Sequence, residues 1–255
     1  MAEMILLPFV GFIIGLFVFI MGGGGGVFYV GILTGLFNIP PVIAASTSLA
    51  TMIPTTAVGA GIHWRSGNLS LKYGLWMLAG AAGGAVAGSL CSGLLPQDIY
   101  AKITGIFLIG LSVQMLVQIL KSRKADQKGA GASRKTAVLL PLLYGVMGGA
   151  MSGLIGISGS GPIIVGLSVL GCSALQIVGT SLFVLSGVSA SGFLMHLQLG
   201  NIDWPLVGLL LIGTVTGTLT GPHLLKKVNK SKFEKGLKPA LFCLTVVMGI
   251  LIVLK

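Results

Sequence analysis

The chain has 255 residues, of which 54% are hydrophobic and only 8% are charged. A soluble domain of this size does not cover its surface with so few charges, so the composition excludes one and indicates a multi-pass membrane protein. The net charge of +11 does not indicate nucleic-acid binding, because the basic residues gather in two polar stretches between apolar segments, residues 121–135 and 226–238. Such clusters are typical of cytoplasmic loops, so we predict a protein of the cell (inner or plasma) membrane whose partner is lipid.

Ten apolar segments follow one another, five in each half of the chain. The first half has segments at about 4–21, 24–37, 41–62, 70–91 and 100–120, and the second at about 136–156, 159–171, 174–195, 204–225 and 238–254. The second segment of each half would extend only ~20 Å as a helix, less than the ~30 Å hydrocarbon core. We predict an all-α polytopic membrane protein with about eight full-length transmembrane helices and two short helices broken by glycine.

The two halves match each other when the sequence is shifted by 133 residues, and this match needs no gap. Thr-Ser-Leu at 47–49 falls on the same residues at 180–182, and Gly-Asn at 67–68 falls on Gly-Asn at 200–201. Chance similarity between apolar segments would match leucines but not these residues. We therefore divide the chain into a first transmembrane repeat (1–120), a basic linker (121–135) and a second transmembrane repeat (136–255).

Loop charge sets the expected topology. The basic stretches 121–135 and 226–238 are predicted to be cytoplasmic, whereas loop 92–99, which carries an acidic residue and no basic one, is predicted to be outside. Loops 92–99 and 226–238 are equivalent by the shift, so the two repeats are predicted to be inverted, with both termini outside. This topology requires that the first two segments of each half either cross together or form a hairpin.

Glycine-rich stretches begin both short segments: GGGGG at 22–26 and GISGSG at 156–161. Inverted repeats with glycine-broken segments are typical of a binding site near the bilayer midplane. A helix N-terminus offers unpaired N–H groups and a partial positive charge, and glycine lets a ligand approach the backbone. Close helix packing is the alternative explanation for these glycines. We predict an anion site formed by Gly23, Gly24, Gly25, Gly26, Ser158, Gly159, Ser160 and Gly161.

Two equivalent hydroxyl pairs, Thr47–Ser48 and Thr180–Ser181, begin the long segment after each short one. We predict that they donate hydrogen bonds to the anion; the alternative is that they bond only to carbonyls of their own helix. No acid is available inside the membrane to hold a cation. All five carboxylates lie in or beside predicted loops: Glu3, Asp98, Asp126, Asp203 and Glu234.

His63 and His196 are the two histidines that match between the halves, and Asn68 and Asn201 follow them in the Gly-Asn turns. One interpretation is a gate or proton-handling group on each face. The other is a pair of histidines solvated at the membrane interface. The sequence shows no metal-ligand spacing, no catalytic grouping and no phosphate-binding loop, so we expect no metal, no cofactor and no enzymatic activity.

The glycine-rich loop, the A-x-T-S-L at 45–49, the Gly-Asn turn and the duplication together resemble the TauE/SafE-type sulfite exporter family, also called the toluene sulfonate uptake permease family. The resemblance covers nearly the whole chain. In that family a proline often follows the glycine loop; Pro162 supplies it in the second half, but Tyr29 occupies the matching position in the first.

The resemblance implies transport of sulfite, sulfonates, sulfoacetate or related anions. We predict a secondary transporter of small sulfur-containing or organic anions that works by alternating access around a midplane site. An anion channel that uses the same site is the alternative, and a homodimer is compatible with either interpretation.

Overall fold

The fold was analysed in a computed structural model, which describes residues 6–96, 98–99, 101–106, 109–110, 113, 136–198, 202–227, 246–247 and 250. The predicted linker 121–135, most of the basic stretch 226–238 and Asn201 lie outside these residues. The described part of the chain is helical and contains no strand. The all-α prediction is therefore confirmed for these residues.

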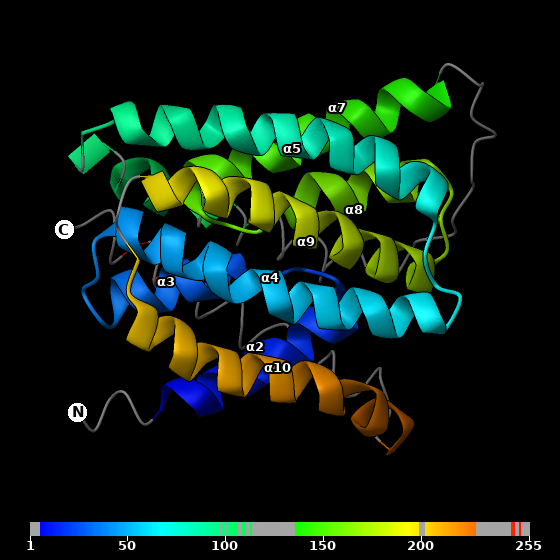
Figure 1. The fold of residues 1–255 in the computed structure, drawn as a ribbon, viewed down its shortest axis with the longest axis horizontal. Coiled ribbons are helices and arrows are strands. Elements are labelled where there is room, and N and C mark those ends of the chain that lie inside the picture. Colours follow the sequence, from blue (N-terminus) through cyan, green and yellow to red (C-terminus); the bar gives the residue numbers. More distant parts are fainter. Residues whose placement is uncertain are drawn as a thin grey trace.

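Eight helices have defined bounds in the described part of the chain (Figure 1). Their starts and ends agree with the predicted segments to within three residues, because glycines and polar loops interrupt the apolar stretches at these points. In the first half they are α2 (Leu7–Met21), α3 (Gly26–Gly35), α4 (Pro41–Arg65) and α5 (Leu71–Leu94). In the second half they are α7 (Thr136–Ile155), α8 (Ser160–Val169), α9 (Ala174–Gln198) and α10 (Trp204–Lys227).

Five of these helices, α4, α5, α7, α9 and α10, are long and apolar enough to cross a membrane. The helix α2 has 15 residues, and α3 and α8 have 10 each. The described residues thus contain five membrane-length helices rather than the predicted eight. Of the three remaining predicted spans, 4–21 corresponds to α2, and 100–120 and 238–254 fall largely outside the described residues.

Each short helix contacts the helix before it. The rings of Phe17 on α2 and Phe28 on α3 pack edge to face with centroids 5.0 Å apart. In the second half, a Cβ atom at Gly148 on α7 would lie 3.0 Å from Ile163 on α8. The sequence left a joint crossing and a hairpin as alternatives, and in the structure α2–α3 and α7–α8 are helical hairpins.

Left-handed glycines make the reversal in both hairpins. In the first hairpin, Gly22 (φ 70°) ends α2 and Gly25 (φ 81°) precedes α3. Gly156 (φ 71°) and Gly159 (φ 55°) occupy the same places between α7 and α8. Side chains with a Cβ atom rarely adopt this conformation, so glycine is the residue that fits these four positions.

The positions of the hairpins show that the alignment of the two halves needs a correction. Gly22 and Gly156 are equivalent, which is a shift of 134, whereas α4 and α9 begin at Pro41 and Ala174, a shift of 133. The difference arises because five residues (36–40) connect α3 to α4 but only four (170–173) connect α8 to α9. The prediction of a match without a gap was wrong by this one residue. With the correction, the residue equivalent to Tyr29 is Ile163 rather than Pro162.

The two halves are interlocked, since the first helix of each packs against the fourth helix of the other. A Cβ atom at Gly15 on α2 would overlap the backbone of Thr214 on α10. The equivalent Gly149 on α7 faces Ala81 on α5 in the same way. Small residues let these backbones approach closely, as in many membrane helix pairs.

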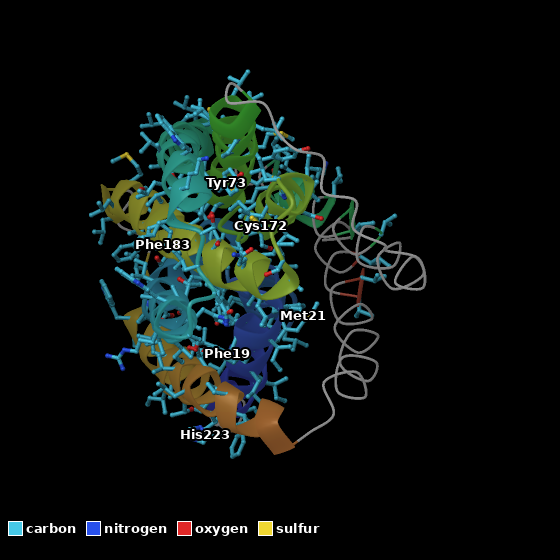
Figure 2. The ribbon with its side chains drawn as sticks, turned by 90° about the vertical axis from the view of Figure 1, so that its right-hand side faces the viewer. Phe19, Met21, Tyr73, Cys172, Phe183 and His223 are labelled. Atoms are coloured by element: carbon cyan, nitrogen blue, oxygen red, sulfur yellow. The ribbon has the colours of Figure 1, made fainter. Side chains whose placement is uncertain are left out.

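The interlocked pairs lie on opposite sides of a central layer. In Figure 2 the α5–α7 pair, near Tyr73, and the α2–α10 pair, near Phe19 and His223, are separated by α9, which carries Phe183. Figure 1 shows α4 and α9 side by side between the two pairs. The equivalent helices α4 and α9 run in opposite directions, α4 from left to right and α9 from right to left.

Candidate anion site at the glycine loops

The two glycine-rich stretches, residues 22–26 and 156–160 and here called the glycine loops, contact each other directly. A Cβ atom at Gly26 would lie 2.5 Å from the backbone nitrogen of Ser158. One at Gly24 would lie 2.7 Å from the Ser158 side chain, and one at Gly23 would lie 4.0 Å from Ser160 Oγ. The fold therefore brings together residues from both halves that the sequence placed in one site.

The glycine loops lie at half the height of the long central helices. The Met52 methyl carbon and Leu185 Cδ1 are each 3.0 Å from a Cβ atom built at Gly24. Met52 lies near the middle of α4 and Leu185 near the middle of α9. These contacts place the glycine loops beside the midpoints of both long helices.

Several backbone amides of the glycine loops lack a hydrogen-bond acceptor among the described residues. A buried amide without an acceptor costs free energy, and these amides lie at the positive ends of α3 and α8. Together these N–H groups form a cluster of uncharged hydrogen-bond donors that attracts an anion. They belong to Gly24, Gly26, Val27, Ser158, Ser160 and Gly161.

The paired serines hold the glycine loops in place. Ser48 Oγ donates a hydrogen bond of 2.9 Å to the carbonyl of Gly156. Ser181 Oγ lies 2.9 Å from the carbonyl of Gly22 in the equivalent contact, and equally close to the carbonyl of Val178 on its own helix, so these two carbonyls compete for its proton. Because a hydroxyl has one proton, these serines cannot also donate to an anion in this arrangement. Both bonds join one half of the protein to the other.

The paired threonines lie apart from the glycine loops. Thr47 Oγ1 accepts a hydrogen bond of 3.4 Å from the amide of Asp203, just before α10 begins. Thr180 Oγ1 accepts one of 2.9 Å from the amide of Ser70, just before α5 begins. Each threonine therefore anchors the start of the fourth helix of the opposite half.

Both matched histidines are buried, with exposed fractions of 6% for His63 and 0% for His196. The interpretation of solvated interfacial histidines is therefore wrong. His196 Nε2 lies 3.0 Å from the carbonyl of Gly153, and His63 Nε2 lies 3.5 Å from that of Phe19. Each histidine thus reaches the last turn of the helix that precedes the glycine loop of its own half.

The remaining polar residues of the prediction add little to this site. Asn68 donates its backbone amide to the carbonyl of His63, at the end of α4 and away from the glycine loops. Among the described residues, no three histidine, cysteine, aspartate or glutamate side chains lie close enough to hold a metal ion. The described site therefore consists of backbone amides, serine hydroxyls and apolar side chains.

A buried polar group that the predicted site did not include lies on the same short helix. Tyr29 of α3 is buried next to Thr55 of α4 and Thr214 of α10. In the sequence, this group is visible as a difference between the two halves. In the corrected alignment the residues equivalent to Tyr29, Thr55 and Thr214 are all apolar: Ile163, Val188 and Ala81.

Comparison with known proteins identifies the family. Residues 7–252 match the model of the family described as "Sulfite exporter TauE/SafE". The chain belongs to the TauE/SafE family. The resemblance seen in the sequence is thereby confirmed, and the five membrane-length helices agree with a multi-pass membrane protein of this transporter family.

Curated relatives of this TauE/SafE-family protein carry general names. "Probable membrane transporter protein YdhB" of Bacillus subtilis (strain 168) is 31% identical, over 94% of this chain and 96% of its own length. "Probable membrane transporter protein YjnA" of the same organism is 30% identical over 83% and 88%. "Probable membrane transporter protein MJ0441" of Methanocaldococcus jannaschii is 27% identical over 98% and 95%. No solved structure matches the chain.

Proposed function

We propose that this TauE/SafE-family protein is a secondary transporter of small sulfur-containing or organic anions, such as sulfite, sulfonates and sulfoacetate. The observation that carries the proposal is the meeting of the two glycine loops, with unpaired amides from both halves, at half the height of α4 and α9. The family supports transport, and its name supports a sulfur oxyanion.

The chemistry of the site suits an anion that has to be released again. The amides at the starts of α3 and α8 provide positive potential without a full charge. A Cβ atom at Gly24 would meet the side chains of Met52, Leu185 and Ser158, and all three of these side chains are neutral. A lysine or arginine here would hold an anion strongly, whereas transport requires a site that binds and then lets go.

The direct contact between the glycine loops defines what has to move. An anion can reach the amides only when the two hairpins separate. Because α2 packs on α10 and α5 packs on α7, the moving bodies in our proposal are these mixed pairs rather than the two sequence halves. Opening toward one side and then the other gives alternating access.

We propose that the halves are inverted in the membrane, which the opposite directions of α4 and α9 support (Figure 1). In this topology the linker 121–135 and the stretch 226–238 are cytoplasmic and both termini are outside. The partners are the transported anion and the lipid of the cell membrane.

A thermal-shift screen of the purified protein tests the proposal. Sulfite, sulfate, thiosulfate, sulfoacetate, taurine and simple carboxylates are compared, and a ligand at 100 times its Kd stabilises by roughly 2.7 kcal/mol. Stabilisation by one or more anions, with saturable uptake into proteoliposomes, is the expected result. Uptake that does not saturate, with currents above carrier turnover, would indicate the channel instead.

Gly23→Ala makes the test specific for the glycine loops. A Cβ atom at Gly23 would meet its nearest neighbours at 3.4 and 4.0 Å, so the variant can fold, yet its methyl group crowds the free amides. We expect about tenfold weaker binding, which is about 1.4 kcal/mol. The matched control is Gly83→Ala, where a Cβ atom would meet no described atom within 4 Å. Wild-type affinity in Gly23→Ala would refute this placement of the site.

A further inference from the structure

Three hydroxyl-bearing side chains from three helices meet in the interior. Tyr29 on α3 is 1% exposed, and Thr55 on α4 and Thr214 on α10 are fully buried. Thr55 and Thr214 lie near the middles of their helices, at the same height as the glycine loops. This group of three is called the hydroxyl cluster below.

The hydrogen bonds of the hydroxyl cluster leave one donor unused. Thr55 Oγ1 lies 2.8 Å from the carbonyl of Thr51 and 2.9 Å from Thr214 Oγ1, so its partners are accounted for. The Tyr29 hydroxyl interacts with both threonine hydroxyls but makes no hydrogen bond of proper geometry among the described residues. A fully buried O–H without an acceptor is unfavourable, and it is most simply explained by an acceptor that comes from outside the chain.

The other half of the protein shows that the fold does not need these hydroxyls. Ile163, Val188 and Ala81 occupy the equivalent positions, and all three are fully buried in one apolar cluster with Leu185. Packing at this place is therefore satisfied by apolar side chains. The hydroxyls of the first half serve something that packing alone does not require.

The hydroxyl cluster adjoins the glycine loop of the first half. The Tyr29 ring edge lies 3.1 Å from a Cβ atom built at Gly25, the residue that precedes α3. The unpaired amides of Gly26 and Val27 belong to the same turn of α3. An anion at these amides is therefore within reach of the phenol when the hairpin moves.

We infer that Tyr29, Thr55 and Thr214 contact the transported anion and that the Tyr29 hydroxyl donates a hydrogen bond to it. The anion is then held by side chains beside the glycine loop of the first half, and not by the equivalent side chains of the second half. The inference rests on the proposed function. An anion with at least two oxygen atoms fits this arrangement, because one oxygen can bind the amides of α3 while another binds the hydroxyl cluster. Sulfite, sulfonates and carboxylates have this form, whereas a halide ion does not.

The inference is tested by removing single hydroxyl groups and titrating the purified protein with the strongest oxyanion of the screen. Tyr29→Phe and Thr55→Val keep the shape of the side chain and remove only the hydroxyl. Each is expected to raise the Kd about tenfold. Thr56→Val is the matched control, because Thr56 is the next residue on α4, is equally buried and donates to the carbonyl of Met52. Its Kd should stay within twofold of the wild type.

The melting temperature without ligand separates binding from structure. Because the Tyr29 hydroxyl has no acceptor among the described residues, Tyr29→Phe should not lower the melting temperature. A lower melting temperature with an unchanged Kd would assign the cluster to packing and overturn the inference. Stabilisation by sodium chloride, but not choline chloride, that disappears in Thr55→Val would indicate a cation site and also overturn it.

The two proposals fail in different ways. If the wild-type protein binds no anion in the screen, the proposed function fails and the inference fails with it. If the wild type binds an oxyanion and both Tyr29→Phe and Thr55→Val bind it equally well, the inference alone is wrong.

Discussion

The two halves make the same contacts at the ends of their hairpins but differ in the side chains beside them. The bond from Ser48 to Gly156 has its counterpart in the bond from Ser181 to Gly22, and both are 2.9 Å long. Beside the first hairpin, however, lies the hydroxyl cluster, and beside the second an apolar cluster. Contacts present in both halves are those that the duplicated fold requires. A polar group present in only one half is a better candidate for function.

The largest effect is expected where helix backbones touch in both halves. Gly15→Ala and Gly149→Ala each place a methyl group against a backbone carbonyl, of Thr214 and Ala81 respectively. We expect each variant to lose about 2–3 kcal/mol of unfolding free energy. Denaturant titration in detergent micelles measures this loss.

The control for these variants is Gly83→Ala, which lies within α5 but has open space around its Cβ position. It should be neutral or stabilise by up to about 1 kcal/mol, since alanine favours a helix. If only one of the two variants were destabilised, the packing of the halves would not be equivalent.

A smaller effect is expected from the serine bonds between the halves. Ser48→Ala and Ser181→Ala leave the buried carbonyls of Gly156 and Gly22, respectively, without this donor. Each change should cost about 1–2 kcal/mol of stability. The same titration measures it. A loss of anion affinity with unchanged stability would show instead that the serines contact the anion themselves, as the sequence suggested.

The smallest effect is expected at a position where the halves differ. Ser46 Oγ lies 2.9 Å from His196 Nδ1, whereas the residue equivalent to Ser46 in the second half is Gly179, next to His63. Ser46→Ala should cost about 1 kcal/mol, because His196 keeps its bond to the carbonyl of Gly153. Ser66→Ala is the control, since Ser66 is exposed and bonds only its own helix. Equal stability of the two variants would show that the bond to His196 contributes nothing.

Much of the fold could be predicted because apolar length and glycine position are local properties of the sequence. The segment predicted at 159–171 is α8, Ser160–Val169, and the one at 174–195 is α9, Ala174–Gln198. The one-residue offset between the hairpins and the long helices could not be predicted. Apolar residues on both sides of the α3–α4 connection match equally well with or without a gap.

Contacts between helices that are far apart along the chain were harder to foresee. His63 and His196 stand at the ends of apolar segments, which is the usual place of an interfacial residue. Their burial depends on carbonyls of α2 and α7, and no local pattern indicates these partners. In the sequence, Tyr29 stands out only as a departure from a proline pattern, because Thr55 and Thr214 lie far from it along the chain.

The interlocked packing also has a consequence for how the protein is made. The glycine face of α2 is covered by α10, around Thr214, so its partner is synthesised only when the chain is nearly complete. The face of α5 is covered by α7, which begins at Thr136, near the middle of the chain. The α5–α7 pair can therefore assemble early in translation, whereas the α2–α3 hairpin waits in the bilayer with its small residues uncovered. A nascent chain that stops before residue 204 retains that uncovered face, which membrane quality control can recognise.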